Sequence, residues 1–213
     1  MYITPEDIHN YASRMSTAES EVLKKLNRNT HARVLRPRML SGHLQGRFLE
    51  LISRLKAPRV ILEIGTYTGY SAICLAQGLA PGGVLHTIDH NPELEDFSTS
   101  FFNQAGLSDS IRLHVGEALD IIPTIEDIPE LVFIDADKEN YIRYFDLVIE
   151  RMPRGGIILA DNVLWSGKVL EPAASGDKET LALQQFNEYV AAHPAVTSLL
   201  LPFRDGLMIL EKV

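Results

Sequence analysis

Two apolar stretches of the sequence end abruptly in oxygen-bearing side chains. The segment "ELVFIDADKENY" runs from apolar, mostly branched residues into Asp135, Asp137 and Lys138, and "GGIILADNVLW" does the same at Asp161 and Asn162. Carboxylate and amide oxygens are the ligands of hard cations such as Mg²⁺ or Ca²⁺, which keep water or substrate oxygens in the rest of their shell. If the two stretches are neighbouring strands, Asp135, Asp161 and Asn162 form a candidate cation site.

Both segments also allow a purely structural interpretation. Asp and Asn are favoured at helix caps and in turns, so Asp135 could cap the next helix while Asp161 and Asn162 form a turn. Either segment taken singly fits that interpretation. Their occurrence together, in a chain that also carries a cofactor-type turn, favours the cation.

The elements that must position these residues alternate along the chain. Residues 1–57 have helical apolar spacing, with a turn around Gly42 and Gly46 before a helix that ends ahead of Pro58. From there strand and helix patterns alternate, as in a parallel sheet covered by helices on both faces. The predicted strands are 59–65, 83–90, 111–118, 131–136, 156–162, 196–202 and 207–213.

The last two predicted strands flank the tight turn "FRDG" and form a hairpin pattern, which predicts antiparallel pairing at one edge of the sheet. No repeat, low-complexity tract or linker divides the chain. We therefore expect an α/β fold in one domain, residues 1–213, with an N-terminal helical region at 1–57 and a core at 58–213.

A glycine-containing turn follows the first predicted strand. In "EIGTYTGYS", Gly65 and Gly69 bracket a strand-to-helix turn at the carboxyl end of the sheet, where open parallel sheets bind ligands. The second strand ends in Asp89, where a carboxylate can accept both hydroxyls of a ribose. A tight turn without a ligand is the alternative, but Asp89 at the equivalent strand end favours a nucleotide-like cofactor.

Tyr67 indicates which cofactor the turn suits. Dinucleotide-binding turns typically carry G-x-G-x-x-G, and this chain has the bulky Tyr67 at the position of the middle glycine. That residue, together with the acid Glu63, suits a ligand that offers an amino acid's ammonium and carboxylate in place of phosphates. S-adenosylmethionine has both groups and a ribose for Asp89. The missing glycine counts against a nicotinamide-dependent dehydrogenase.

Lys138 follows Asp135 by three residues, at the start of the next predicted helix. The helix dipole disfavours a cation there, and a catalytic role would explain the lysine. A cation that binds a substrate hydroxyl lowers its pKa, and a lysine with a lowered pKa could accept the proton. The oxygen would then attack the sulfonium methyl in line. The alternative is an ordinary surface lysine, whereas a non-catalytic binding module would not need Lys138 at all.

Composition narrows the class of protein. The chain has 46% hydrophobic residues but no apolar run near the ~20 residues of a membrane span, and its N-terminus lacks the order of a secretory signal. We expect a cytoplasmic protein without a membrane partner.

The single cysteine, Cys74, is predicted to be a buried structural thiol. The net charge of −8 gives no general attraction for nucleic acid, although "KKLNRNTHARVLRPRM", residues 24–39, is a local basic stretch.

Three segments, "LEIGTYTGYSAICLA", "VFIDADKENY" and "LADNVLWSGKV", closely resemble motifs of the cation-dependent class I O-methyltransferases, which include the caffeoyl-CoA and catechol enzymes. The similarity runs from about Leu40 to the C-terminus. The resemblance implies a Rossmann-like, doubly wound, mostly parallel seven-stranded sheet with an antiparallel C-terminal edge and extra N-terminal helices. It also implies a homodimer.

The resemblance further implies a role for each matching residue. It makes Asp135, Asp161 and Asn162 the metal ligands and Lys138, beside Asp135, the catalytic base. The implied S-adenosylmethionine contacts are Ser41, Glu63, Gly65, Thr66, Ser71, Asp89, Ala118 and Asp137. Plant coenzyme A ester enzymes have asparagine where this chain has Ser166, so the resemblance does not fix the methyl acceptor.

We therefore predict a methyltransferase that uses S-adenosylmethionine and a divalent cation, most readily Mg²⁺, with Mn²⁺ or Ca²⁺ as alternatives. Its predicted acceptor is one oxygen of a vicinal dihydroxy aromatic such as a catechol or caffeoyl compound. Trp165 either stacks on that substrate or belongs to the core. The alternative acceptor is 5-hydroxyuridine in tRNA, which the basic stretch would help to bind.

Overall fold

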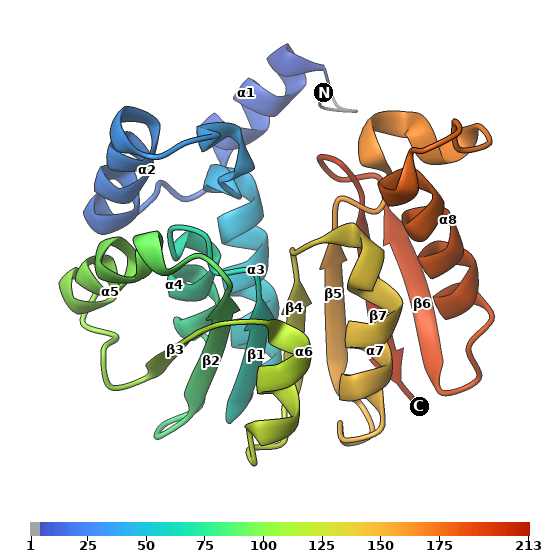
Figure 1. Ribbon diagram of the computed structural model, residues 1–213. Coiled ribbons are helices and arrows are strands. Elements are labelled where there is room, and N and C mark those ends of the chain that lie inside the picture. The colour runs from blue at the N-terminus through green and yellow to red at the C-terminus, as the bar shows by residue number, and fades with distance from the viewer. Residues whose placement is uncertain (1–4) are drawn as a thin grey trace.

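Seven strands form one central sheet in the computed structural model, which describes residues 5–213 (Figure 1). The strands are β1 (Val60–Ile64), β2 (Val84–Asp89), β3 (Ile111–Val115), β4 (Leu131–Ile134), β5 (Ile157–Asp161), β6 (Val196–Leu201) and β7 (Leu207–Lys212). Their order is β3-β2-β1-β4-β5-β7-β6. The first five strands are parallel, whereas β7 pairs antiparallel with both β5 and β6. The predicted fold class and the antiparallel edge are confirmed.

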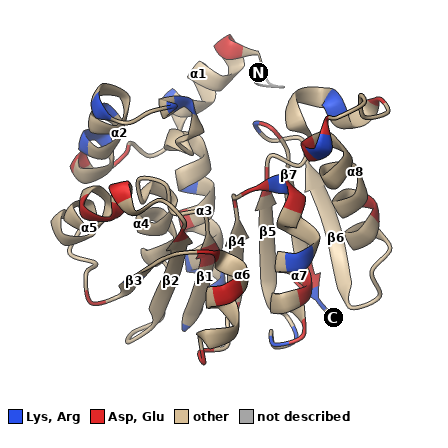
Figure 2. Ribbon diagram, viewed as in Figure 1, with Lys and Arg blue, Asp and Glu red and all other residues tan. Residues whose placement is uncertain are grey.

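The strand order reverses at β1, which pairs with β2 on one side and β4 on the other. Parallel pairing places the carboxyl ends of β1, β2, β4 and β5 at the same edge of the sheet. Ile134 pairs with Ala160, so the acids that follow, Asp135 and Asp161, leave adjacent strands side by side. Figure 2 shows acidic and basic segments next to one another at this edge, between β4 and the start of α7.

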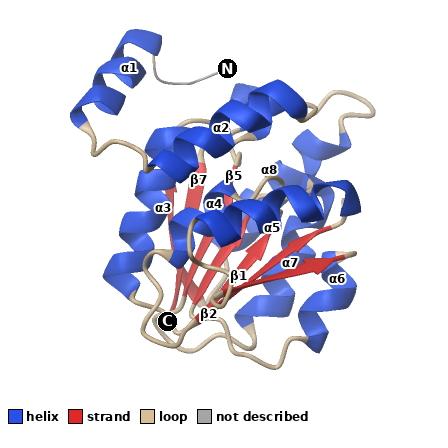
Figure 3. Ribbon diagram, turned by 90° about the vertical axis from the view of Figure 1, so that its left-hand side faces the viewer, coloured by secondary structure: helices blue, strands red, loops and turns tan. Residues whose placement is uncertain are grey.

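Helices cover both faces of the sheet (Figures 1 and 3). One face carries α3 (Gly42–Lys56), α4 (Tyr70–Ala76) and α5 (Glu95–Gln104), and the other carries α6 (Ala118–Ile121), α7 (Tyr141–Ile149) and α8 (Lys178–Ala191). The N-terminal helices α1 (Glu6–Met15) and α2 (Glu21–Arg33) extend the first layer. Short 3₁₀ helices are η1 (Pro37–Met39), η2 (Pro92–Leu94), η3 (Ile122–Thr124), η4 (Lys138–Asn140) and η5 (Trp165–Leu170).

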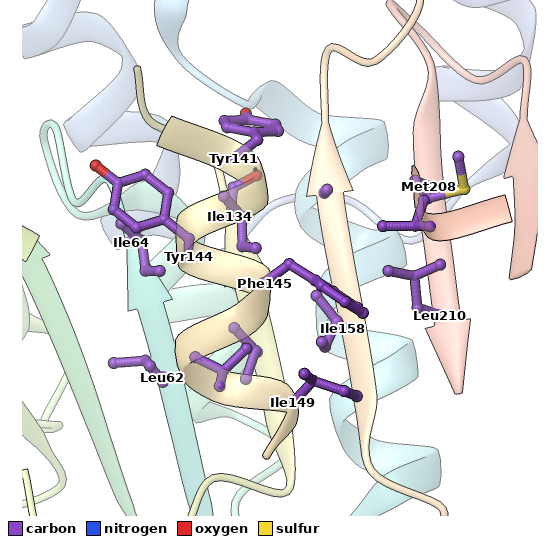
Figure 4. Close-up of a cluster of buried hydrophobic side chains, with 14 of the residues drawn as sticks. Leu62, Ile64, Ile134, Tyr141, Tyr144, Phe145, Ile149, Ile158, Met208 and Leu210 are labelled. Atoms are coloured by element: carbon purple, nitrogen blue, oxygen red, sulfur yellow. Dashed lines mark hydrogen bonds between the residues drawn. The ribbon is translucent and has the colours of Figure 1, made fainter. Parts of the chain in front are cut away.

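Two apolar clusters, one on each face, hold the layers together. Figure 4 shows Phe145 and Ile149 of α7 beside Ile158 of β5, with Leu62 of β1 on the other side of the helix. The central strands are apolar on both faces because both are covered. Each large apolar side chain in these clusters contributes about 1.5–3 kcal/mol to stability when it is fully buried. The clusters therefore hold in place the sheet whose strands end in the polar residues.

The described part of the predicted N-terminal helical region is helical, and residues 1–4 of that region lie outside the described residues. Cys74 is a buried free thiol, as predicted, and burial raises its pKa. Within residues 5–213 no helix is both long and apolar enough to cross a membrane.

The predicted turn around Gly46 is wrong, because Gly46 lies inside α3. The φ angle of Gly42 is +76° where that helix begins, so only the first of the two glycines serves a change of direction. A Cβ at Gly46 would lie 2.6 Å from the Tyr70 ring and 2.8 Å from the Cys74 sulfur. The second glycine therefore serves the close packing of α3 against α4.

We expect Gly46→Ala to destabilise the fold by about 1–3 kcal/mol, because the added methyl group overpacks the contact between α3 and α4. This cost exceeds the stabilisation gained from alanine's higher helix propensity. Urea unfolding measures the change. The exposed α3 residue Leu51 supplies the control, since Leu51→Ala should alter the free energy of unfolding by less than about 0.5 kcal/mol. Unchanged stability of Gly46→Ala would show that Tyr70 and Cys74 move aside without cost.

Candidate active site

The glycine turn between β1 and α4 touches the end of β4. Gly65 has φ +103°, and a Cβ there would lie 2.0 Å from the backbone oxygen of Asp135. Only glycine permits this approach. The candidate cofactor turn and the first candidate cation ligand are therefore parts of one site.

The carboxylate of Asp89, the last residue of β2, is held by backbone N–H groups. Its two oxygens accept hydrogen bonds from the Tyr67 N–H at 2.6 Å and the Asn91 N–H at 2.9 Å. Gly116 N–H donates to the Asp89 carbonyl at 2.9 Å, which brings the start of α6 and Ala118 to the same strand end. These hydrogen bonds hold the Asp89 carboxylate in one orientation at the end of β2.

Glu63 lies beneath the glycine turn, with no exposed surface. Thr87 donates a hydrogen bond to its carboxyl group at 2.5 Å, and the Thr66 hydroxyl lies 2.5 Å from that of Thr87. Burial raises the pKa of Glu63 to about 8, opposed by hydrogen bonds from Ser71 and Thr87. Glu63, Thr66 and Ser71, three of the predicted cofactor residues, thus form one buried network that supports the turn.

The ends of β4 and β5 bring the candidate cation ligands around one ammonium group. Lys138 Nζ lies 3.1 Å from Asn162 Oδ1 and 3.4 Å from Asp135 Oδ1. Asp161 is buried beside them, and burial, reinforced by the negative charge of Asp135, raises its pKa to about 6. With only 6% of its surface exposed, Lys138 is not a surface lysine.

This donor set suits a hard cation. Oxygens of Asp135 and Asn162 lie around Lys138 Nζ, and the neighbouring Asp161 is a buried acid whose ionised form a cation would stabilise. Among the described residues no group of three or more His, Cys, Asp or Glu side chains could hold a metal. The candidate site therefore depends on the Asn162 amide as its third ligand.

Comparison with known proteins identifies the family. A family model described as O-methyltransferase matches residues 13–213. The catechol O-methyltransferase of Mycobacterium tuberculosis is 37% identical over 161 residues, 75% of this chain and 72% of that protein. The catechol O-methyltransferase of Niastella koreensis is 32% identical over 205 residues, 92% and 90% of the two chains. The O-methyltransferase of Bacillus cereus, solved in complex with SAH, has a TM-score of 0.90 at 30% identity, covering 97% of each chain.

The chain belongs to the O-methyltransferase family. The resemblance inferred from the three motifs is thereby confirmed, and with it an S-adenosylmethionine-dependent enzyme of the class I fold. The roles predicted for individual residues stay predictions.

The other predicted contacts of this O-methyltransferase lie around the same edge. Asp137 is exposed, and its carboxylate accepts hydrogen bonds from Tyr144 and Asn140, both at 2.5 Å. Ser41, almost fully buried, precedes α3, and its carbonyl accepts a hydrogen bond from Arg204. Ser41 and Asp137 are brought to the site from elements far apart in the sequence.

Tyr141 was missed by the sequence analysis. Its hydroxyl accepts a hydrogen bond from Lys138 Nζ at 2.5 Å and donates to the Asp161 carbonyl at 3.0 Å. The ring is fully buried at the top of α7, near Ile134 (Figure 4), and burial raises its pKa well above the usual value. The apolar helical spacing of Tyr141, Tyr144, Phe145 and Val148 predicts a core position, so only the hydroxyl's contacts reveal its place in the site.

Trp165 lies in a strained segment beside the site. Trp165 and Ser166 have φ angles of +47° and +57°, which non-glycine residues rarely adopt. Asp205 in the β6–β7 turn holds the segment by accepting a hydrogen bond from the Ser166 N–H at 2.5 Å. The Trp165 ring packs against the α7-side core, with Lys138 Nζ 5.8 Å from its centre. Trp165 is therefore partly buried against the core, and its stacking on a substrate stays a prediction.

The raised pKa of Glu63 predicts a pH dependence of stability. Between about pH 4.5 and 8 the folded chain holds a proton on Glu63 that the unfolded chain has lost, so the free energy of unfolding should fall as pH rises through this window. Glu63→Gln should remove this part of the fall. Urea unfolding at pH 5, 6, 7 and 8 measures it, with Glu93→Gln at an exposed position as the control. Parallel pH profiles for Glu63→Gln and the parent would contradict the buried, protonated carboxyl.

Proposed function

We propose that this O-methyltransferase requires a divalent cation and transfers the methyl group of S-adenosylmethionine to one hydroxyl of a vicinal dihydroxy aromatic. The observation that carries the proposal is the convergence of Lys138 Nζ with Asn162 Oδ1 and Asp135 Oδ1, at 3.1 and 3.4 Å. A proton acceptor and two oxygen ligands share one space, and that space adjoins the glycine turn through Gly65.

Asp135, Asp161 and Asn162 would hold the cation, with Mg²⁺ favoured by the all-oxygen donor set and Mn²⁺ or Ca²⁺ as alternatives. When bound, the cation would supply Lewis-acid chemistry that lowers the pKa of a substrate hydroxyl. Two adjacent hydroxyls suit such a site because they can fill two of the positions that the protein leaves open.

Lys138 would take the proton of the reacting hydroxyl, at Nζ. Tyr141 supports this role, because its hydroxyl accepts from the lysine while donating to the Asp161 carbonyl, and so holds the amine at the ends of β4 and β5. The lysine is buried, which excludes bulk water from the place where the proton is transferred.

The cofactor would lie over the glycine turn. Asp89 would bind the ribose hydroxyls, while Glu63, Gly65, Thr66 and Ser71 would shape the site of the methionine part. Ala118 would contact the adenine, and Ser41 and Asp137 would also lie next to the cofactor. Support comes from the backbone-held carboxylate of Asp89 and from the contact between Gly65 and Asp135, by which the glycine turn adjoins the candidate cation site.

The relatives named as catechol O-methyltransferases favour a catechol-type acceptor. The tRNA alternative has no comparable support. The basic stretch lies on α2 and the loop that follows it, where Figure 2 shows basic and acidic segments interspersed, and Lys24 and Lys25 already contact Glu21 and Gln104.

The remaining expectations concern the whole molecule. We propose that the chain acts as one cytoplasmic domain and as a homodimer. The apolar residues Ile8, Tyr11 and Met15, spaced along α1 and more than half exposed, support a second copy packing against the N-terminal helices.

Methyl transfer to catechol tests the proposed function. The purified enzyme with S-adenosylmethionine should lose turnover in EDTA and regain it with Mg²⁺ or Mn²⁺, and Asp161→Ala should lower turnover as EDTA does. Chromatography of methylated catechol gives the rate. Full activity of the metal-stripped enzyme would rule out the cation site, whereas methylation of hypomodified tRNA in preference to catechol would rule out the substrate class.

Lys138→Ala should lower kcat by about 10²- to 10⁴-fold, the usual contribution of a general base. Its affinity for S-adenosylmethionine should stay close to the parent's, because the amine contacts the acceptor side. The deficit should shrink at high pH, where the substrate hydroxyl ionises without a base. Rates between pH 6 and 10 with catechol, alongside cofactor titration by calorimetry, measure both effects. A variant with the parent's kcat and pH profile would remove Lys138 from catalysis.

A further inference from the structure

Gln45 of α3 reaches the candidate cation site from the opposite layer of the fold. Its side-chain nitrogen donates a hydrogen bond to Asp161 Oδ2 at 2.6 Å, across 116 positions of sequence. Only 1% of the residue is exposed. Burying an amide side chain is costly unless both of its polar ends have hydrogen-bond partners.

Arg204 supplies the second partner and fixes the direction of the amide. From the β6–β7 turn its Nη1 donates to Gln45 Oε1 and also to the carbonyl of Ser41. A guanidinium has donors only, so Gln45 must present its oxygen to Arg204. The amide nitrogen is therefore directed at Asp161, and the opposite orientation would set oxygen against carboxylate and nitrogen against guanidinium.

Asp161 is consequently held from two sides. Gln45 donates to Oδ2, and the Asn162 N–H donates to Oδ1 at 2.9 Å. Rotation of the carboxylate about its Cβ–Cγ bond would break at least one of these bonds. The partners that orient a ligand in this way commonly change metal affinity by 10- to 100-fold when they are removed.

We propose that Gln45 is a positioning residue of the candidate cation site, orienting the Asp161 carboxylate through an amide whose direction Arg204 fixes. The inference rests on the cation site proposed above. A buried amide that only anchors α3 to the sheet would need its contact with Arg204 but not a donor aimed at a cation ligand. The two roles therefore differ in what Gln45→Glu should do.

Mn²⁺ binding to the whole protein, followed by electron paramagnetic resonance in the presence of SAH, tests the proposal. Gln45→Met removes both polar ends at similar length, whereas Gln45→Glu keeps an acceptor for Arg204 and loses the donor to Asp161. Both variants should weaken Mn²⁺ binding by about 10- to 100-fold. The exposed residue Gln104 of α5 provides the control, since Gln104→Met should bind Mn²⁺ as the parent does. Circular dichroism in EDTA establishes that each variant is folded.

Calorimetric titration with SAH separates positioning from general damage, because a positioning role leaves cofactor affinity unchanged while Mn²⁺ affinity falls. Parent-like Mn²⁺ binding by Gln45→Glu would overturn the inference, even if Gln45→Met fails to fold. Equal losses of SAH and Mn²⁺ affinity would also overturn it. A parent that binds no Mn²⁺ would refute the proposed cation site and the inference with it. If the parent binds Mn²⁺, either of the two outcomes above refutes the inference alone.

Discussion

The parallel pairing of β4 between β1 and β5 is the constraint on which the site depends. It places the residues after Ile64, Ile134 and Ala160 at one edge of the sheet. The contact between Gly65 and the Asp135 carbonyl then draws the β1 turn against the end of β4, which no residue with a Cβ would allow. The candidate cofactor turn, the candidate cation ligands and Lys138 are adjacent because three neighbouring strands end together.

Several ionisable side chains at this edge of the sheet are buried. Glu63, Lys138 and Asp161 carry ionisable groups in places with little or no contact with solvent. Charges in such surroundings are costly unless they have close partners, and each of these groups has them. Thr87 bonds Glu63, Tyr141 bonds Lys138, and Gln45 bonds Asp161. Each partner comes from a different element, so the packing of the layers and the electrostatics of the site support each other.

The two sides of the sheet contribute unequally to the site. The α7 side supplies Lys138 and Tyr141, at the start of a helix that follows β4 directly. The opposite side supplies Gln45 of α3, while Arg204 enters from the turn between the antiparallel strands β6 and β7. The C-terminal hairpin thus does more than complete the sheet, because its turn joins the beginning of α3 to the end of β5.

Much of this arrangement was predictable from local sequence. Strands that are apolar on both faces and alternate with helices specify a covered parallel sheet, and acids directly after such strands must lie at its carboxyl edge. Asp135, Asp161, Asn162, Lys138 and Asp89 were therefore identifiable as site candidates, since each lies next to the strand that positions it. The three family motifs are short, continuous segments because each consists of a strand end and the residues that follow it.

What local sequence could not determine depends on contacts between distant segments. The sequence around Gly46 predicts a turn, and only the packing of Tyr70 and Cys74 against it explains the glycine. The spacing around Tyr141 predicts a core residue, and only the contact of its hydroxyl with Lys138 links it to the site. Gln45 and Arg204 carry no motif, and they are joined only because β7 inserts between β5 and β6 and turns toward α3. The sequence by itself determined which residues end the strands. Tertiary structure alone decided which distant side chains orient them, because a hydrogen bond across 116 positions leaves no periodic pattern in the chain.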